Sequence, residues 1–209
     1  MVSNKKPTII YWLDNALYLN ITNQCSNNCW FCLRNYKSGV GGFNLKLKEE
    51  PTAAQVVSEL EAVLPSRRWS EVVFCGFGEP TSRLDLLLEA ARWIKVRAPT
   101  VPIRLDTNGH GYALNQGRDV AVELKAAGVS KTSVSLNGHN EETYNENCRP
   151  AVKGGFEAVL EFVRKAKASG LEVEVSAVRM NEVDVRKVEE IANSLFVQFR
   201  VRDYIPCFW

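Results

Sequence analysis

Hydrophobic positions along the chain form two kinds of pattern, which alternate. Short apolar runs of strand length fall at residues 16–22, 71–75, 103–106, 132–136, 173–178 and 197–201. Between them, apolar residues recur every three or four positions at residues 56–64, 84–96, 120–127, 156–168 and 185–195. Several of these second segments stop at a glycine or before a proline, as helices do. The chain therefore predicts about six strands that alternate with helices.

This alternation predicts a fold of the α/β class, in which a parallel sheet is covered by helices. Six βα units make either an open doubly wound sheet or an incomplete barrel, and periodicity alone does not choose between the two. No linker, repeat or low-complexity tract interrupts the pattern. We expect one domain over residues 1–209, with residues 1–15 as an N-terminal extension.

Polar and glycine-rich segments follow the predicted strands at the point where each strand ends. In chain order they are the cysteine segment 25–32, residues 76–80, residues 106–109, Ser135 with Asn137, and residues 179–181. In both parallel architectures the carboxyl ends of the strands meet at one edge, where ligands bind. The sequence therefore predicts a functional site at this edge.

Composition and charge narrow the class of protein. Of 209 residues, 45% are hydrophobic and 24% are charged, and the net charge is +2, which is ordinary for a globular domain. Such a balance does not indicate a nucleic-acid-binding surface. No apolar stretch approaches the roughly 18 residues that span a bilayer, and no signal-peptide core is visible. We expect a cytoplasmic protein.

The cysteine segment carries the most specific chemistry. Cys25, Cys29 and Cys32 have the spacing C-x3-C-x2-C. In a chain without an export signal, such a cluster favours metal binding over disulfides. One loop of this size can give three thiolates to a cubic iron–sulfur cluster and leave the fourth iron open to another ligand.

Structural zinc is the alternative that the spacing leaves open. Closed zinc sites use four protein ligands, commonly in two C-x2-C pairs. A fourth ligand would have to be one of the isolated residues Cys75, Cys148, Cys207 and His110. Because those cysteines are scattered along the chain, we expect no second cluster.

Two motifs together resemble those of the radical S-adenosylmethionine (SAM) superfamily. They are the cysteine triplet after the first strand and the segment Gly76-Phe77-Gly78-Glu79-Pro80 after the second. A narrower resemblance is to the TatD-associated radical SAM family. The segments that carry it are residues 22–25, 33–35, 39–42, 74–81 and 135–137, with Tyr144 and Cys148-Arg149-Pro150.

The resemblance implies an incomplete (βα)6 TIM-like barrel with a [4Fe-4S] cluster on Cys25, Cys29 and Cys32. It implies reductive cleavage of SAM to methionine and a 5′-deoxyadenosyl radical, which takes hydrogen from an unidentified substrate. It also implies an external one-electron donor of the flavodoxin or ferredoxin type, and a functional link to a TatD-type nuclease.

Several residues receive roles in SAM binding from this resemblance. Gly76 and Gly78 would let the backbone approach the methionine end, beside Phe77, while Glu79 would accept from the ammonium group and Pro80 would fix the loop exit. The alternative is a plain glycine turn that carries a surface glutamate.

Other candidates lie at the later strand ends. Asp106 and Asn108 can bind the ribose or a cation, or can form an ordinary Asn-Gly turn. Ser135 and Asn137 stand where the family places ribose contacts. Either Arg149 or Arg179 can neutralise the SAM carboxylate, or each can be a solvated surface residue.

Weaker candidates complete the set. Val178 can pack on adenine or be a core residue, and Asn181 lies close by. His110 can face the substrate, although a histidine beside a turn is more often polar surface. The glycine-bearing loop of residues 34–48 is a candidate lid.

Three functions are compatible with these residues. The leading one is a radical SAM enzyme with an unidentified substrate. A glycyl-radical-type activating enzyme would use the same cofactors on a protein. A zinc-stabilised α/β protein without catalysis would use the cysteines for structure alone.

Overall fold

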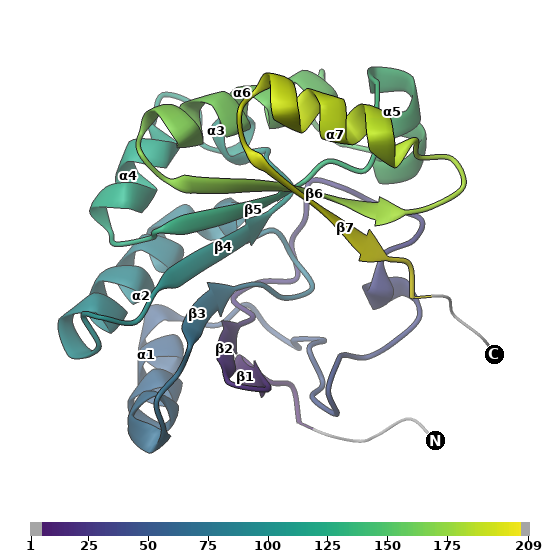
Figure 1. Ribbon diagram of the computed structural model, residues 1–209. Helices are drawn as coiled ribbons and strands as arrows, with labels where there is room; N and C mark the ends of the chain where they lie inside the picture. The colour runs from purple at the N-terminus through teal and green to yellow at the C-terminus, as the bar shows by residue number, and fades with distance from the viewer. Residues whose placement is uncertain (1–5, 206–209) are drawn as a thin grey trace.

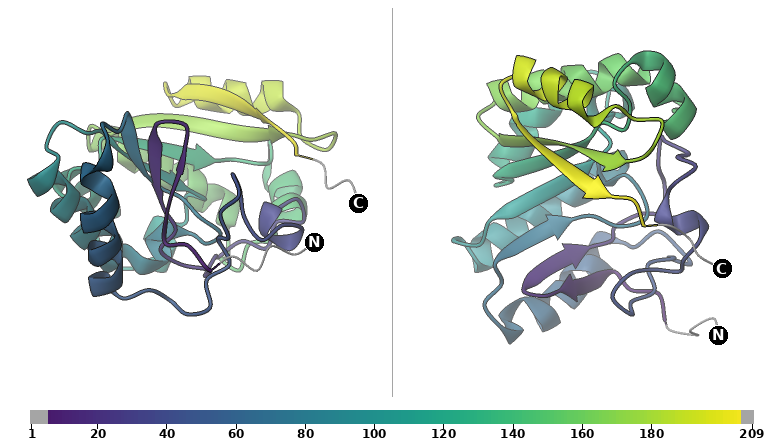
Figure 2. Two further views of the ribbon diagram at one scale, coloured as in Figure 1. Left: turned by 90° about the horizontal axis from the view of Figure 1, so that it is seen from below. Right: turned by 45° about the vertical axis from the view of Figure 1, so that its right-hand side comes forward.

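The computed structural model describes residues 6–205, and its centre is one seven-stranded sheet with the strands in sequence order. The strands are β1 (Ile10–Leu13), β2 (Ala16–Leu19), β3 (Glu71–Phe74), β4 (Ile103–Thr107), β5 (Lys131–Ser135), β6 (Glu172–Arg179) and β7 (Gln198–Asp203). β1 pairs with β2 antiparallel, and every later pair is parallel. The sheet curves into an incomplete barrel that has β1 and β7 at its two edges (Figures 1 and 2).

Helices cover the convex face of this sheet, as Figure 1 shows. The longer ones are α1 (Ala53–Val63), α2 (Leu84–Arg97), α4 (Val120–Ala126), α6 (Gly155–Ala168) and α7 (Val185–Ser194). Shorter pieces are α3 (Gly111–Leu114), α5 (Glu141–Cys148) and the 3-10 turns η1 (Leu33–Asn35), η2 (Leu64–Ser66) and η3 (Pro80–Arg83). Among the described residues, no helix is both long and apolar enough to cross a bilayer.

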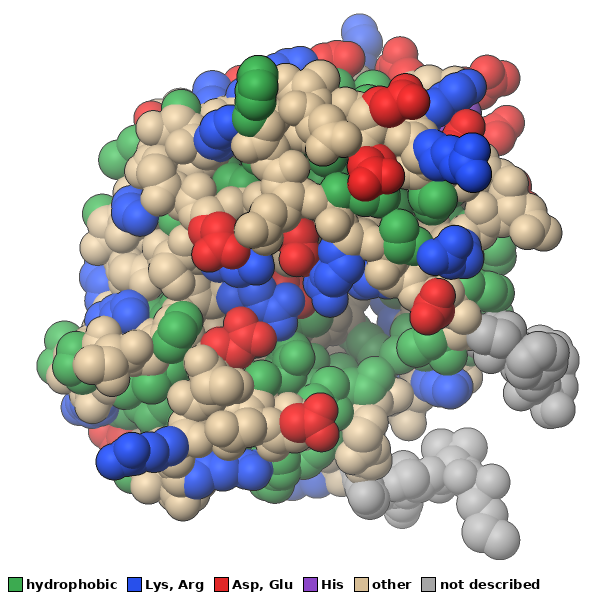
Figure 3. Space-filling view, in the orientation of Figure 1, with side chains coloured by type: hydrophobic (Ala, Val, Ile, Leu, Met, Phe, Trp, Pro, Cys, Tyr) green, Lys and Arg blue, Asp and Glu red, His purple; other side chains and the backbone are tan. Residues whose placement is uncertain are grey.

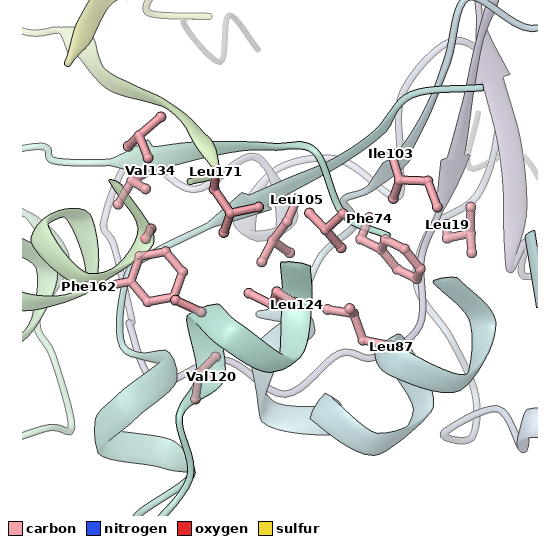
Figure 4. Packing of buried hydrophobic residues seen from close by; sticks show 14 of the residues in the cluster. Leu19, Phe74, Leu87, Ile103, Leu105, Val120, Leu124, Val134, Phe162 and Leu171 are labelled. Atoms are coloured by element: carbon pink, nitrogen blue, oxygen red, sulfur yellow. The ribbon is translucent and has the colours of Figure 1, made fainter. Parts of the chain in front are cut away.

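The hydrophobic core fills the space between sheet and helices. Phe74 and Leu105, on neighbouring strands, point toward Leu87 of α2 and Leu124 of α4, and all four are fully buried (Figure 4). Burying a side chain of this size stabilises the fold by about 1.5–3 kcal/mol relative to its exposure. The core therefore holds the helices on the convex face.

The concave face of the sheet is polar. In β4, buried Ile103, Leu105 and Thr107 alternate with partly exposed Arg104 and Asp106, so the polar pair points away from the helices. The register carries this alternation across the barrel, because Asp106 pairs with Ser133, Ser135 with Ser176, and Val178 with Arg202. From β4 to β7 the interior of the barrel is thus lined mainly by polar groups, whereas Tyr18 and Val73 continue the same face on β2 and β3.

The structure confirms the α/β fold and the incomplete barrel of parallel strands. Within the expected N-terminal extension of residues 1–15, residues 10–13 form β1, a strand that was not predicted. These four residues are Ile-Tyr-Trp-Leu, a sequence of high β propensity, and a turn at Asp14, whose φ is 50°, folds them back onto β2. The first predicted strand ends at Leu19 rather than at residue 22.

Helix α5 was absent from the predicted set because its sequence, EETYNENC, is mostly polar and lacks an apolar stripe. The helix begins at Asn140, whose side chain accepts a hydrogen bond from the backbone N–H of Thr143 at 2.8 Å. Its buried side chains are Thr143, Tyr144, Asn147 and Cys148. α5 therefore packs through a small set of mixed polar and apolar residues.

The candidate lid, residues 34–48, packs beside the β1–β2 hairpin. The ring of Phe43 lies 4.9 Å from that of Trp12 and 5.9 Å from that of Tyr11. Thr8 donates its backbone N–H to Asn44 O at 2.8 Å. A role for this loop as a lid stays a prediction.

Asn20, the residue after β2, joins three segments that are distant in sequence. Its buried side chain donates to Thr8 O at 3.1 Å and to Leu45 O at 2.9 Å, and it accepts from Phe77 N–H at 3.2 Å. This amide therefore holds the N-terminal segment, the loop of residues 34–48 and the glycine segment after β3 to the same strand end.

We predict that Asn20→Ala lowers the free energy of unfolding by about 2–4 kcal/mol, because three buried partners lose their hydrogen bonds. Urea unfolding followed by circular dichroism measures the change. Asn193→Ala, at an exposed position of α7, is the matched control and should stay within about 0.5 kcal/mol of the wild type. Equal stability of Asn20→Ala and the control would show that the three bonds do not hold these segments.

Candidate functional site

The cysteine loop, residues 25–32, leaves the carboxyl end of β2 and is attached to the end of α5. Asn28 N–H donates to Cys148 O at 2.9 Å, and Ala151 N–H donates to Ser26 O at 2.8 Å. The indole N–H of Trp30 donates to Asn147 Oδ1 at 2.9 Å. These contacts fix the backbone of the loop from within the protein.

All three cysteines of the loop are free thiols and partly exposed. Burial raises the pKa of Cys25 to about 11, and burial also raises the pKa of Cys32. A hydrogen bond from Cys148 lowers the pKa of Cys29. Over residues 6–205, no group of three or more His, Cys, Asp or Glu side chains forms a ready metal-ligand set. The loop thus supplies three separate thiols rather than a closed set of ligands.

Cys148, expected to be one of several scattered cysteines, lies beside Cys29. It is fully buried, and its hydrogen bond to Cys29 is the main reason that its own pKa is raised. The two residues are far apart in sequence, so only the packing of α5 on the loop reveals the contact. By contrast, Cys75 lies beside Asp106, and burial raises its pKa. Cys207 lies outside the described residues.

The glycine segment after β3 runs close against β2 and the start of the cysteine loop. A Cβ at Gly76 would overlap Asn20 Oδ1, and a Cβ at Gly78 would lie 2.5 Å from the carbonyl oxygens of both Thr22 and Gln24. Glu79 N–H also donates to Gln24 O at 2.7 Å. The two glycines are therefore needed for packing within the protein, whether or not a ligand is bound.

Glu79 is 2% exposed, so the surface-glutamate alternative is wrong. Its Oε1 accepts from Thr81 N–H at 3.0 Å, from the Thr81 hydroxyl at 2.7 Å and from the Thr107 hydroxyl at 2.7 Å. Its Oε2 accepts from Asn108 N–H at 2.6 Å. Burial raises the pKa of this carboxyl, while the four donors act in the opposite direction. Glu79 thus joins the end of β3 to the end of β4.

Asp106 and Asn108 point to different surroundings. Asp106 lies on the concave face, 3.1 Å from the guanidinium of Arg104, and burial raises its pKa. Asn108 Nδ2 donates to Ser26 Oγ at 2.8 Å and lies 3.8 Å from Cys25 Sγ. The Asn-Gly turn is also present, since Gly109 has a φ of +83°. Asn108 therefore connects the turn after β4 to the cysteine loop.

His110 is fully buried, so its assignment to polar surface was wrong. Its Nδ1 lies 2.9 Å from Ser26 Oγ, and its Nε2 lies 3.0 Å from the Tyr144 hydroxyl and 3.2 Å from Gly155 O. Burial lowers its pKa to about 4. His110 is consequently neutral near pH 7 and links the cysteine loop to helices α5 and α6.

At the far side of the barrel, Asn137 and Ser135 occupy the end of β5. Asn137 is 4% exposed, and its Oδ1 accepts from Val178 N–H at 2.8 Å. Ser135 Oγ accepts from the guanidinium of Arg202 at 3.0 Å. Sequence reasoning did not single out Arg202, because a basic residue in the last strand has no motif around it.

The two arginines expected near a SAM carboxylate are both exposed. Arg149 has a φ of 46° and ends α5 in the left-handed conformation. Arg179, with a side chain 63% exposed, lies 3.6 Å from Asp203. Asn181 is exposed, whereas Val178 is 9% exposed. The roles of these residues toward SAM stay predictions.

Hydrogen bonds from Asn108 to Glu79 and to Ser26 bring the segments after β2, β3 and β4 together. Figure 3 shows the open face of the barrel, with acidic and basic side chains at its centre and a hollow beside them. The site thus combines a thiol-bearing loop, a rigid glycine segment and a polar interior.

Comparison with known proteins gives a family match. The family model of the Radical SAM superfamily matches residues 19–195. GTP 3',8-cyclase of Paenarthrobacter nicotinovorans is 29% identical over 172 residues, which is 82% of this chain and 43% of that protein. A probable dual-specificity RNA methyltransferase RlmN of Prochlorococcus marinus is 30% identical over 142 residues, 67% of this chain and 38% of that protein. The chain spans less than half the length of these two relatives.

Solved structures share the fold at low sequence identity. The structure described as native anSMEcpe with bound AdoMet has a TM-score of 0.66 and 19% identity, and the match covers 90% of this chain and 50% of that one. HydG, a maturase of the [FeFe]-hydrogenase, also has a TM-score of 0.66, with 16% identity and coverage of 91% and 43%. These structural matches show that the chain shares the barrel fold with both proteins.

We predict that Glu79→Gln lowers the free energy of unfolding by about 1–3 kcal/mol. Each carboxylate oxygen accepts from a fixed backbone N–H, so the amide nitrogen of glutamine would face a donor in either orientation. Urea unfolding measures the loss. Glu89→Gln, at an exposed position of α2, should leave stability unchanged. An unaltered midpoint for Glu79→Gln would mean that the four donors do not stabilise the carboxylate.

A second prediction concerns the pH dependence of stability. Because the pKa of folded His110 is about 4 against an ordinary value of 6.5, the unfolded chain takes up the proton first as the pH falls. This residue should therefore lower the free energy of unfolding by about 2 kcal/mol from pH 7 to pH 5. The loss should disappear in His110→Gln and persist in His139→Gln. Equal pH dependence in the two variants would contradict the assignment.

Proposed function

Because the chain belongs to the radical SAM superfamily, we propose that it reductively cleaves S-adenosylmethionine at a [4Fe-4S] cluster held by Cys25, Cys29 and Cys32. The observation that carries the proposal is the position of these three free thiols on one loop at the carboxyl edge of the incomplete barrel. The same edge receives Glu79 and Asn108. A superfamily fold with this loop is the arrangement that such chemistry requires.

The donor set fits a cluster that leaves one iron open. Three thiols on one short loop suit three irons, and the exchangeable position remains for SAM. The chemistry that the bound group supplies is one-electron cleavage of SAM to methionine and a 5′-deoxyadenosyl radical, which abstracts hydrogen from the substrate.

The protein's own residues hold the loop and stabilise its thiolates. Asn27 N–H donates to Cys25 Sγ at 3.4 Å, and Asn108 Nδ2 approaches the same sulfur from β4. Arg34 donates from its guanidinium to Asn27 O at 3.1 Å, and its charge acts to lower the pKa of each of the three thiols. These contacts favour the ionised form that binds iron.

Binding of SAM would use the ends of the neighbouring strands. Since the oxygens of Glu79 already accept from four donors, we assign the ammonium contact to the backbone of residues 76–80 rather than to this carboxylate. Ser135 and Asn137 would face the ribose, and Val178 the adenine. Either Arg149 or Arg179 would reach the carboxylate. The rest of the SAM site would be lined by Phe77, Pro80 and Asp106.

The narrower identity and the partners belong to the same proposal. The motifs ending in Cys148-Arg149-Pro150 support the TatD-associated radical SAM family, and with it a functional link to a TatD-type nuclease. A flavodoxin or ferredoxin would supply the electron. Free thiols on an accessible loop suit a reducing compartment such as the cytoplasm. The substrate is not specified by the relatives' names, because they cover a nucleotide cyclase and an RNA methyltransferase.

Anaerobic reconstitution with iron and sulfide tests the proposal. The wild-type chain should take up close to four irons and four sulfides and, after reduction with dithionite in the presence of SAM, release 5′-deoxyadenosine. Cys29→Ala should lose both properties to background because one of three ligands is missing. Cys75→Ala, which removes a thiol outside the loop, should keep both.

Two results of the same experiment would contradict the proposal in whole or in part. A colourless protein with one stoichiometric zinc ion would support the structural-zinc alternative and contradict the proposal. A full cluster without 5′-deoxyadenosine release, in wild type and Cys75→Ala alike, would separate cluster binding from SAM cleavage and leave only the first standing.

A further inference from the structure

Three arginines lie on the concave face of the barrel, and two of them are paired with carboxylates. Arg104 forms two hydrogen bonds with Glu71, both at 3.1 Å, and lies equally close to Asp106. Arg200 Nε donates to Glu174 at 2.8 Å. These two guanidinium groups are neutralised within the protein.

Arg202 differs from both. In the described part of the chain it has no carboxylate within salt-bridge distance, and its one hydrogen bond runs to Ser135 Oγ at 3.0 Å. Its Nε is buried and has no hydrogen-bond partner there. An arginine remains charged at neutral pH and has five N–H donors, so most of its bonding capacity is unused. The side chain is half-buried, and Asp106 and Glu174 act on its charge from beyond salt-bridge distance, so Arg202 keeps N–H donors that no protein group uses.

The position of Arg202 directs this charge toward the proposed site. The residue is next to last in β7 and pairs with Val178 of β6, at the carboxyl ends of both strands. Its guanidinium reaches across to Ser135, the last residue of β5. The cysteine loop leaves the carboxyl end of β2, so Arg202 and this loop share one end of the barrel.

We propose that Arg202, oriented by Ser135, binds an oxyanion of the substrate, either a carboxylate or a phosphoryl group, in the interior of the barrel. This inference rests on the proposed function, because the ligand is taken to be the substrate of that reaction. A guanidinium offers parallel N–H groups that match the oxygens of both anions. The paired state of Arg104 and Arg200 leaves Arg202 as the interior guanidinium that can give this contact.

Binding of simple anions to the SAM-loaded, cluster-reconstituted protein tests the site. Isothermal titration would use inorganic phosphate and acetate as separate probes, so that the preferred probe identifies the phosphoryl or the carboxylate class. Arg202→Gln should weaken binding of the preferred probe by about ten- to a hundredfold. Arg202→Lys should recover part of the binding, since lysine keeps the positive charge but lacks the parallel N–H groups of the guanidinium. Arg200→Gln is the matched control from the same strand and should bind like the wild type.

The outcomes separate this proposal from the function on which it rests. Anion binding that depends on Arg202, in a protein that releases no 5′-deoxyadenosine, would preserve the oxyanion site while the radical function fails. Absence of binding in the wild type, or equal loss in Arg200→Gln and Arg202→Gln, would overturn the oxyanion site. So would a loss of SAM affinity in Arg202→Gln with phosphate and acetate binding unchanged, because the guanidinium would then serve SAM. Circular dichroism and iron content verify that each variant is folded and loaded.

Discussion

The buried carboxylate of Glu79 is the contact on which the geometry of the site depends. A charge removed from water is tolerated only when its hydrogen-bonding capacity is filled, and here four donors fill it. Two of those donors belong to the end of β4, so the carboxylate fixes β4 against the segment that follows β3. Asn108 extends the connection to Ser26 in the cysteine loop. Three strand ends therefore hold their positions through bonds within the protein.

The alternation of side chains along the strands determines what those strand ends surround. Apolar residues point to the helices and make the core, which leaves the polar residues of the same strands to line the barrel. A polar interior gains little from the hydrophobic effect, and its charges need partners. Glu71 and Glu174 provide them for Arg104 and Arg200. Packing of the helices on the sheet thus stabilises the fold, and the polar interior of the barrel is available to bind a ligand.

The sequence predicted what periodicity and parallel topology determine. Six strands and five helices follow from apolar spacing, and the gathering of residues 25–32, 76–80 and 106–109 follows from the rule that parallel strands end at one edge. Contacts between segments that are distant in the sequence could not be predicted from these two rules. Asn108-Gly109 has the appearance of a simple turn, and nothing near His110 in the sequence shows that Ser26 and Tyr144 will enclose it. Helix α5 has no apolar stripe, so neither the helix nor its contact with the cysteine loop could be predicted.

The same contact explains how a fixed loop can carry thiols that lie apart from one another. The loop donates hydrogen bonds to Cys148 O and Asn147 and accepts one from Ala151 N–H, and these restrain it, whereas each sulfur moves by rotation about a single side-chain torsion. Burial opposes ionisation at Cys25 and Cys32, and Cys148 favours it at Cys29. In the proposed site, Cys25, Cys29 and Cys32 would bind the metal centre as thiolates, so they would lose their protons on binding, and its positive charge would offset the cost of their burial. The restrained backbone would then fix the position of the centre, and rotation of the side chains would let the three sulfurs reach it.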